Sequence, residues 1–343
     1  MRVLICLLIF IGLFSACVPE PESPTPVAGQ NLLNDRDDFV YVINEGNFRW
    51  GNATLTAINL TQNFVTSDLY YLANQQPLGD VFQSMTYANG SFWIVVNNSG
   101  KVEKIDKQSL KSLGVIGGLR SPRYLCALPN HKAYITDIYQ QAITVVDLST
   151  LQIKGKIALP GWTEEMLSED SIVWVTNIKK EYIYRINTQT DVIKDSIEIG
   201  MGGNSLGKDA QGRLWVYATG ADGIGAKLVC LNSVNKEIIK SFSFLSSGGG
   251  NLKIATDGQT LYWLRAGGVW KMGVEDIALP SEPWIQQDLQ NAYGLGVHPT
   301  TGDIFIADAM DYVQAGKVIQ YSNAGVQKGS WKVGVIPNGF LFQ

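Results

Sequence analysis

One short pattern recurs along almost the whole chain, and it constrains the fold more than any other feature. In its clearest copy an apolar strand, residues 133–137, is followed by a short polar break and by an alternating strand, residues 142–147. A turn and a third strand, residues 153–158, complete the copy. Repeats with a period of roughly 20–50 residues are typical of solenoids, propellers and other arrays.

An aromatic residue marks the same place in every copy. The seven positions lie 52, 41, 40, 41, 47 and 43 residues apart, and they are Tyr41, Trp93, Tyr134, Trp174, Trp215, Tyr262 and Phe305. This spacing matches the length of a four-stranded propeller blade. Because alternate residues of a strand face the same side, we expect each aromatic to pack between neighbouring blades. The sequence therefore predicts an all-β, seven-bladed β-propeller with four-stranded blades over residues 37–343.

The two ends of the chain complement each other. Every aromatic strand except the first is preceded by a short strand, at residues 83–87, 123–127, 164–167, 204–207, 251–255 and 293–297. The first copy lacks this strand, but residues 337–341 repeat the pattern of residues 121–125. We therefore expect the C-terminal strand to pair in the first blade, which closes the ring and removes an exposed sheet edge.

The N-terminal segment has the composition of an export signal. Arg2 precedes an apolar run, residues 3–14, that is too short to span a bilayer. Ser15-Ala16-Cys17 then resembles a bacterial lipobox. We expect residues 1–17 to be a lipoprotein signal peptide with lipidated Cys17; cleavage without lipidation is the alternative. Residues 18–36 are rich in proline and predict an extended tether. A lipid anchor of this kind predicts an outer-membrane location at the cell surface.

Composition and the scarcity of reactive side chains exclude several functions. The net charge is −4 and no basic stripe is present, which argues against a nucleic-acid partner. The two histidines, His131 and His298, fall in hairpins of different blades, so they cannot share a metal ion or build a catalytic triad. Cys126 and Cys230 are expected to be buried free thiols. The sequence therefore predicts no catalytic residue, no metal and no cofactor.

Propeller topology sorts the loops onto two faces. The loops that lead into the inner strands and those that follow the aromatic strands share one face, here called face A; the hairpins between these strands form face B. Face A concentrates amides, aromatics and few charges, which suits a polar, neutral or zwitterionic ligand, although Asn and Asp also cap loops. Asn204, Asn251 and Asn338 fall on this face. The predicted ligand-binding residues are Asn44, Glu45, Asn47, Trp50, Gln83, Arg123, Tyr124, Asp137, Trp162, Asn177, Arg265, Tyr293 and Asp308.

Residues 133–147 and 173–187 resemble the Tyr-Val-Thr-Asn repeat of YncE-like propellers. With the lipobox, the tether, residues 44–47 (Asn-Glu-Gly-Asn) and residues 121–125 (Ser-Pro-Arg-Tyr-Leu), the chain is similar to surface lipoprotein propellers of Bacteroidetes, among them the BtuG-type cobalamin-binding proteins. It departs from them at residues 83–85, which are Gln-Ser-Met instead of Asn-Asp-Met. The resemblance implies a non-enzymatic receptor that binds cobalamin or another corrinoid and passes it to a TonB-dependent outer-membrane transporter.

Two other functions stay open from the residues alone. One is an enzyme, such as a metal-dependent lactonase or a lyase that uses Glu164 and Glu165. Adjacent residues of a regular strand face opposite sides, so we do not expect these carboxylates to form a pair by themselves. The other is a scaffold for protein–protein contacts or the cell envelope, without a small ligand.

Overall fold

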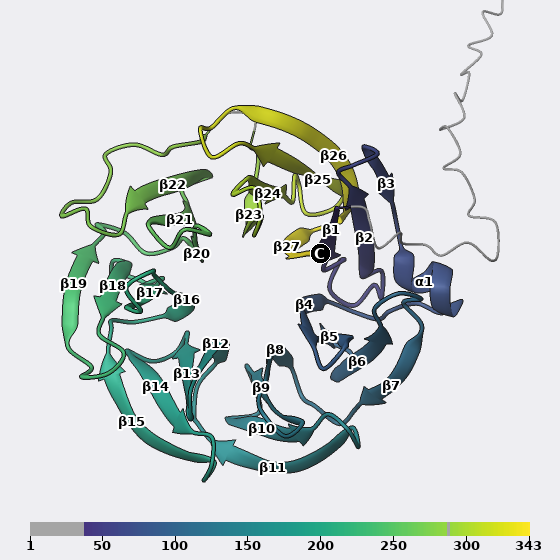
Figure 1. Cartoon of the computed structure of the whole chain (residues 1–343), viewed down its shortest axis with the longest axis horizontal. Coiled ribbons are helices and arrows are strands. Elements are labelled where there is room, and N and C mark those ends of the chain that lie inside the picture. Colours follow the sequence, from purple (N-terminus) through teal and green to yellow (C-terminus); the bar gives the residue numbers. More distant parts are fainter. Residues whose placement is uncertain (1–37, 287–288) are drawn as a thin grey trace, which may run out of the picture.

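A computed structural model describes residues 38–286 and 289–343. Seven antiparallel sheets stand around a central axis as a closed ring (Figure 1). The fold is the seven-bladed β-propeller that the repeat predicts. The expected signal peptide, Cys17 and the tether lie outside the described residues. Within the described ranges, no helix has the length and apolar character of a transmembrane span.

The strands of each blade run outwards from the axis. The inner strands are β27 (Pro337–Phe342), β4 (Phe82–Ala88), β8 (Pro122–Ala127), β12 (Thr163–Glu169), β16 (Gly203–Lys208), β20 (Gly250–Ile254) and β23 (Ala292–Val297). The second strands, which carry the repeated aromatics, are β1 (Phe39–Asn44), β5 (Ser91–Val96), β9 (Lys132–Asp137), β13 (Ile172–Asn177), β17 (Leu214–Ala218), β21 (Thr260–Arg265) and β24 (Ile304–Asp308).

The third and outer strands complete the blades. The third strands are β2 (Thr54–Asn59), β6 (Lys101–Asp106), β10 (Ala142–Asp147), β14 (Tyr182–Asn187), β18 (Lys227–Leu231), β22 (Gly268–Gly273) and β25 (Ala315–Tyr321). The outer strands are β3 (Phe64–Thr66), β7 (Ser112–Ile116), β11 (Gln152–Ala158), β15 (Val192–Glu198), β19 (Ile238–Ser243) and β26 (Gln327–Val335). In the blade of β20–β22, an isolated bridge between Val269 and Ile285 stands in place of a regular outer strand. Pro280 and Pro283 lie in that segment, and proline cannot donate to a ladder.

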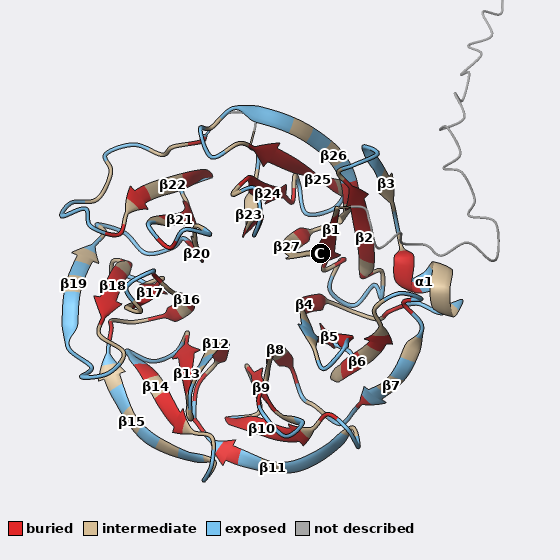
Figure 2. Ribbon diagram, viewed as in Figure 1, coloured by how far each residue is buried: buried red, intermediate tan, exposed pale blue. Residues whose placement is uncertain are grey.

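The hydrophobic core is divided among the junctions between blades. All seven repeated aromatics are buried, as predicted, and each belongs to an apolar cluster. Trp93 of β5, for example, packs with Leu125 of β8 and Ile135 of β9, which belong to the next blade. Burial decreases outwards, and the outer strands are largely exposed (Figure 2). The aromatic repeat therefore holds neighbouring blades together.

The C-terminal strand closes the ring as predicted. β27 pairs with β1 antiparallel, with Leu341 opposite Tyr41 and Phe340 opposite Val42. The rings of Phe340 and Phe342 lie 6.0 and 5.4 Å from the ring of Phe305 in the last blade. β27 therefore joins the first blade to the last through both backbone pairing and aromatic packing.

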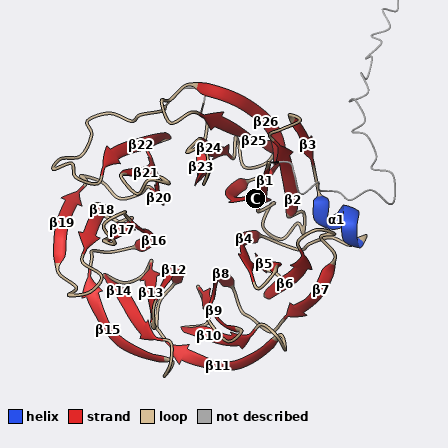
Figure 3. Cartoon of the chain, in the orientation of Figure 1, coloured by secondary structure: helices blue, strands red, loops and turns tan. Residues whose placement is uncertain are grey.

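A short helix was not predicted from the sequence. α1 (Leu69–Asn74) lies at the periphery of the ring, in the loop between β3 and β4 (Figure 3). The Asp68 side chain accepts a hydrogen bond from the Tyr71 N–H and caps the helix, and Leu69 and Tyr70 are buried. Only six residues are helical, which is too few for a clear periodic pattern.

Deletion of residues 337–343 should destabilise the entire ring. The deletion leaves β1 without an inner partner and removes the contacts of Phe340 and Phe342, so we expect a loss of about 5 kcal/mol or more, comparable with the stability of a whole domain. Thermal unfolding monitored by circular dichroism measures the effect. Val234→Ala, on an exposed turn, is the control and should change stability by less than about 0.5 kcal/mol. A truncated chain that melts with the full chain would contradict ring closure by β27.

Candidate ligand-binding site

Every inner strand carries a β-bulge where it leaves face A. In all seven pairings between inner and second strands, the register shifts at the same position of the repeat, which leaves one extra residue in the inner strand. A bulge bends a strand and changes the direction of a side chain. The residues at this position are all polar: Gln83, Arg123, Glu164, Asn204, Asn251, Tyr293 and Asn338.

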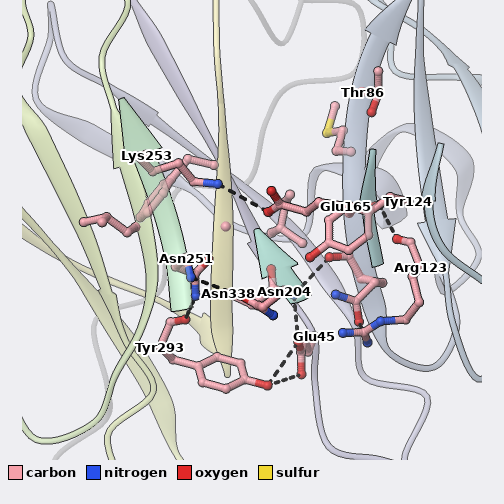
Figure 4. Close-up of a pocket in the computed structure, with 17 residues that line it drawn as sticks. Glu45, Thr86, Arg123, Tyr124, Glu165, Asn204, Asn251, Lys253, Tyr293 and Asn338 are labelled. Carbon is pink, nitrogen blue, oxygen red and sulfur yellow. Dashed lines mark hydrogen bonds and ion pairs between the residues drawn. The ribbon is translucent and has the colours of Figure 1, made fainter. Parts of the chain in front are cut away.

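The bulges surround a cavity of about 340 Å³ at the centre of the ring (Figure 4). Six of the seven bulge side chains line it, together with Glu45, Tyr124, Glu165 and Lys253. An adjoining hollow of about 280 Å³ shares Asn204, Asn251 and Tyr293 with the cavity and extends to Arg265. One polar chamber is thus built from all seven blades.

Hydrogen bonds link the bulges of neighbouring blades. The Asn204 Oδ1 accepts from the Asn251 N–H at 3.2 Å, and the Asn251 Nδ2 donates to the Tyr293 carbonyl at 2.9 Å. The Asn338 Nδ2 donates to the Gln83 carbonyl at 3.1 Å. These bonds hold the wall in one arrangement before any ligand binds, which favours affinity because less freedom is lost on binding.

A glycine makes one of these links possible. Gly250 has a φ of +145°, and a Cβ at this position would lie 2.5 Å from the Asn204 Oδ1. The close approach of Asn204 to the backbone of β20 therefore requires glycine. Gly248 and Gly249 lie in the loop that leads into β20, which begins at Gly250.

Both basic side chains of the cavity, Arg123 and Lys253, form ion pairs. The Arg123 Nε lies 3.0 Å from the Glu164 Oε2, and the same guanidinium donates to the Gln83 Oε1. The Lys253 Nζ lies 3.5 Å from the Glu165 Oε1. The expected strand alternation fails at Glu164 and Glu165, because both residues stand opposite Thr176 in the bulge of β12. Glu165 lines the cavity, and Glu164 pairs with the wall residue Arg123.

Glu45 is the third carboxyl of the site. Its Oε1 accepts a hydrogen bond from the Asn338 Nδ2 at 2.7 Å, and the Tyr293 hydroxyl lies 3.4 Å from both carboxyl oxygens. Burial raises the pKa of Glu45, and the hydrogen bond from Asn338 opposes this effect without cancelling it. Burial also raises the pKa of the Tyr293 hydroxyl, and the nearby Glu45 charge adds to the effect.

Several polar groups of the wall have unused hydrogen-bonding capacity. Among the described residues, no partner is found for the Gln83 Nε2, the Asn204 Nδ2, the Asn251 Oδ1 or the Tyr124 hydroxyl. Donors and acceptors are both present in this set. A ligand that enters the cavity can therefore be held by hydrogen bonds of either direction.

Exposed aromatic side chains gather on the loops of face A. Trp50 is 74% exposed and Phe48 is 58% exposed, both between β1 and β2. Tyr139 lies between β9 and β10, where its ring meets Trp162 edge-on at 5.7 Å, and Tyr312 lies between β24 and β25. Large exposed aromatics beside a polar cavity are typical of binding surfaces.

The predicted site residues divide into three groups. Glu45, Gln83, Arg123, Tyr124 and Tyr293 line the cavity. Asn47, Trp50 and Trp162 lie on loops around it, and the Asn47 Nδ2 donates to the Tyr312 carbonyl at 2.8 Å. The others are committed to internal hydrogen bonds: Asn44, Asp137, Asn177 and Asp308 are buried, and Arg265 binds the carbonyls of Ser246 and Gly248.

Three of the buried members, Asp137, Asn177 and Asp308, act as loop caps, whereas Asn44 donates to Thr54 and Thr56 of the neighbouring strand β2. Asp137 accepts from the N–H groups of Ser121, Tyr139 and Gln140, and Asp308 accepts from those of Gln290 and Asn291. These carboxylates hold the loops of face A in place.

Some polar residues of the cavity wall are not among the predicted ligand-binding residues. The sequence places Asn204, Asn251 and Asn338 on face A, and it gives no indication for Lys253. The signal for the first three was their common position in the repeat. Lys253 enters the wall because the bulge at Asn251 shifts the register of β20, and periodicity does not reveal this shift.

Glu45→Gln should stabilise the fold at neutral and higher pH. A carboxyl with a raised pKa binds more protons when folded, so its ionisation costs stability above the raised pKa. This cost disappears as the pH falls through that pKa towards the ordinary value of 4.5. We expect the melting temperature of the variant to exceed that of the wild type at about pH 8 and to equal it at about pH 4. Each kcal/mol of added unfolding free energy should raise the melting temperature by roughly 2–4 °C.

Thermal unfolding across this pH range provides the measurement. Glu282→Gln, at an exposed position, is the matched control and should follow the wild type at every pH. A difference for Glu45→Gln that has the opposite sign, or that does not depend on pH, would contradict a raised pKa of Glu45 in the folded protein.

Other chemistry of the described residues is limited. Cys126 and Cys230 are free thiols, as predicted, but only Cys230 is fully buried and Cys126 is half-buried; burial raises the pKa of each thiol. In the parts of the chain that the structure describes, no group of three or more His, Cys, Asp or Glu side chains is arranged to hold a metal ion. His298 is buried and bonds to Asp38 on face B, 3.0 Å away.

Solved structures with the same fold have diverse names. A quinonprotein alcohol dehydrogenase-like protein from Bacteroides thetaiotaomicron is 14% identical with a TM-score of 0.71, covering 90% of this chain and 79% of its own. A functionally unknown protein from Desulfotomaculum acetoxidans is 11% identical with a TM-score of 0.67, covering 89% and 98%. A proposed 6-phosphogluconolactonase from Bacteroides fragilis is 13% identical with a TM-score of 0.66, covering 90% and 98%. Likeness at these identities shows the fold alone.

Sequence comparison places the chain in a family defined without a function. No curated protein sequence matches it significantly. A family of domains of unknown function, DUF5074, matches residues 38–331, which is most of the propeller. The chain therefore belongs to the DUF5074 family.

Proposed function

We propose that this protein is a non-enzymatic binding protein that holds a small polar ligand on face A, over the central cavity. One observation carries the proposal: six blades direct their bulged polar residue into the central cavity and the seventh contributes Glu165, and the cavity wall that results has unused donors and acceptors. Polar groups that converge on one hollow, with aromatics beside it, are typical of small-molecule sites.

A corrinoid is the first ligand to test. The support is the resemblance of residues 44–47 and 121–125 to those of the cobalamin-binding surface propellers, and Glu45, Arg123 and Tyr124 of these segments line the cavity. A whole cobalamin molecule, with its side chains and nucleotide loop, is too large for a cavity of about 340 Å³. The ring would therefore lie across face A against aromatics such as Trp50, with one peripheral side chain in the cavity.

The position of Asp38, the first described residue of the propeller, is compatible with a receptor function. Asp38, where the described chain begins, bonds to His298 on face B. A tether that ends there would leave face A free for a ligand and for a transporter. Lipidation at Cys17, an outer-membrane surface location and delivery to a TonB-dependent transporter belong to the same proposal, and they rest on the sequence of residues 1–36.

A protein-binding scaffold is the second candidate. Val313 and Leu245 on face A are largely exposed, in addition to the aromatics. Exposed apolar side chains of this kind favour contact with another protein. The two functions differ in what binds first: a receptor binds a small ligand without its partner, and a scaffold does not.

Calorimetric titration of the full-length protein with cyanocobalamin tests the receptor. We expect one-to-one binding, and we expect Trp50→Ala to weaken it about tenfold, because base- or ring-stacking on an exposed aromatic is worth roughly 1–3 kcal/mol. Tyr87→Ala, an exposed aromatic 50% accessible near face B, is the control and should leave affinity unchanged. Absence of heat and of any shift in melting temperature would reject the corrinoid, and equal losses in both variants would reject the position on face A.

A further inference from the structure

The cavity contains more carboxyls than cations. Three carboxyls, Glu45, Glu164 and Glu165, stand at or directly beside its wall, against two cations, Arg123 and Lys253. Each cation is paired with one of the last two carboxyls, at 3.0 and 3.5 Å. The cavity therefore lacks one positive charge.

Glu45 is the carboxyl left without a cation. Its hydrogen bonds come from the neutral groups of Asn338 and Tyr293, and no ion pair of Glu45 occurs among residues 38–286 and 289–343. The Asn338 amide is oriented by its surroundings, because its Nδ2 faces three acceptors, the Glu45 Oε1 and the carbonyls of Phe82 and Gln83. A buried carboxylate without a counter-ion costs free energy, and a cation from outside would recover that cost.

The surroundings of Glu45 also favour a cation. The Tyr293 ring lines the cavity beside Glu45 and meets the Tyr312 ring edge-on at 5.6 Å. Aromatic faces attract positively charged groups. An anion would find Arg123 and Lys253 already paired and would be repelled by the charge of Glu45.

We propose that the cavity receives a positively charged nitrogen group of the ligand, an ammonium or amidinium, with Glu45 as its counter-ion, and that it excludes carboxylates. The inference rests on the proposed function only in that both place a ligand at this cavity; it names the charge of the group that enters, whatever the rest of the ligand is. A zwitterionic ligand would bind with its cationic end inside and its anionic end towards the loops of face A.

Three small molecules of almost equal shape separate charge from size. Acetate, acetamide and acetamidinium each carry a methyl group on a planar centre, and they are negative, neutral and positive. We expect the full-length protein to bind acetamidinium about tenfold more tightly than acetamide, the difference typical of a charged over a neutral hydrogen bond, and to bind acetate most weakly. Ligand-observed NMR of the methyl signal gives the three affinities.

Two variants connect the selectivity to Glu45. Glu45→Gln keeps the size and one acceptor oxygen but removes the charge, so acetamidinium should lose its tenfold advantage over acetamide. Asp222→Asn removes one negative charge from an exposed loop of face A and should leave the order unchanged. The melting temperature of each variant confirms that it is folded.

The pH dependence provides an independent readout. Arg123, Glu164, Tyr293 and Asn338 are the charged and polar groups that act on Glu45 from the surrounding strands. Since burial raises the pKa of Glu45, the wild-type preference for acetamidinium should be complete above that pKa and disappear as the pH falls through it. In Glu45→Gln the affinity ratio should not change with pH.

These results are separate from the cobalamin titration. The proposal is overturned if acetate binds as tightly as acetamidinium, if none of the three binds at concentrations up to about 0.1 M, or if Glu45→Gln retains the wild-type preference. If cyanocobalamin does not bind but acetamidinium selectivity depends on Glu45, a corrinoid is not the ligand, and the proposal that the cavity receives a cationic group is supported. If cyanocobalamin binds and the selectivity is absent, the reverse holds.

Discussion

The pairing of β27 with β1 is the contact on which the rest of the molecule depends. A propeller blade buries its apolar side chains only against the next blade, so an open ring would leave two unpaired faces. Phe340 and Phe342 pack against Phe305 of the last blade while their strand pairs with Tyr41 and Val42 of the first. The same strand carries Asn338, whose amide holds Glu45 in the cavity. Closure of the ring and completion of the site are therefore one event.

The seven bulges allow the inner strands of the blades to carry polar side chains that a ligand could contact. A regular inner strand presents alternate side chains to the axis, whereas the extra residue in each strand adds a polar group at the same height. Buried polar groups are tolerated when they are hydrogen-bonded. Asn204, Asn251 and Asn338 satisfy part of this requirement by bonding across the junctions between blades. The remaining capacity, and the charge of Glu45, are what a ligand can use.

The two faces have different roles in this arrangement. On face B, His298 accepts N–H groups of its own hairpin through Nδ1 and bonds to Asp38, so the start of the propeller is tied down there. On face A, carboxylates such as Asp137 and Asp308 cap loops through hydrogen bonds to backbone N–H groups. Exposed aromatics such as Trp50 lie on loops of the same face. Loops held by these caps around a hydrogen-bonded cavity wall favour ligand binding, because less conformational freedom is lost when a ligand enters.

The sequence by itself determined the blade count, the strand order and the closure, because the aromatic repeat from Tyr41 to Phe305 reports burial between blades and burial is periodic along a strand. It also identified the face on which Glu45, Gln83, Arg123, Tyr124 and Tyr293 meet, since topology assigns loops to faces. Only the tertiary structure decided that Asp137, Asn177 and Asp308 cap loops while Lys253 and Glu165 line the cavity. The physical reason is the bulge: one extra residue changes which side chains face the axis, and hydrogen bonds across the ring, not local propensity, decide which polar groups stay free.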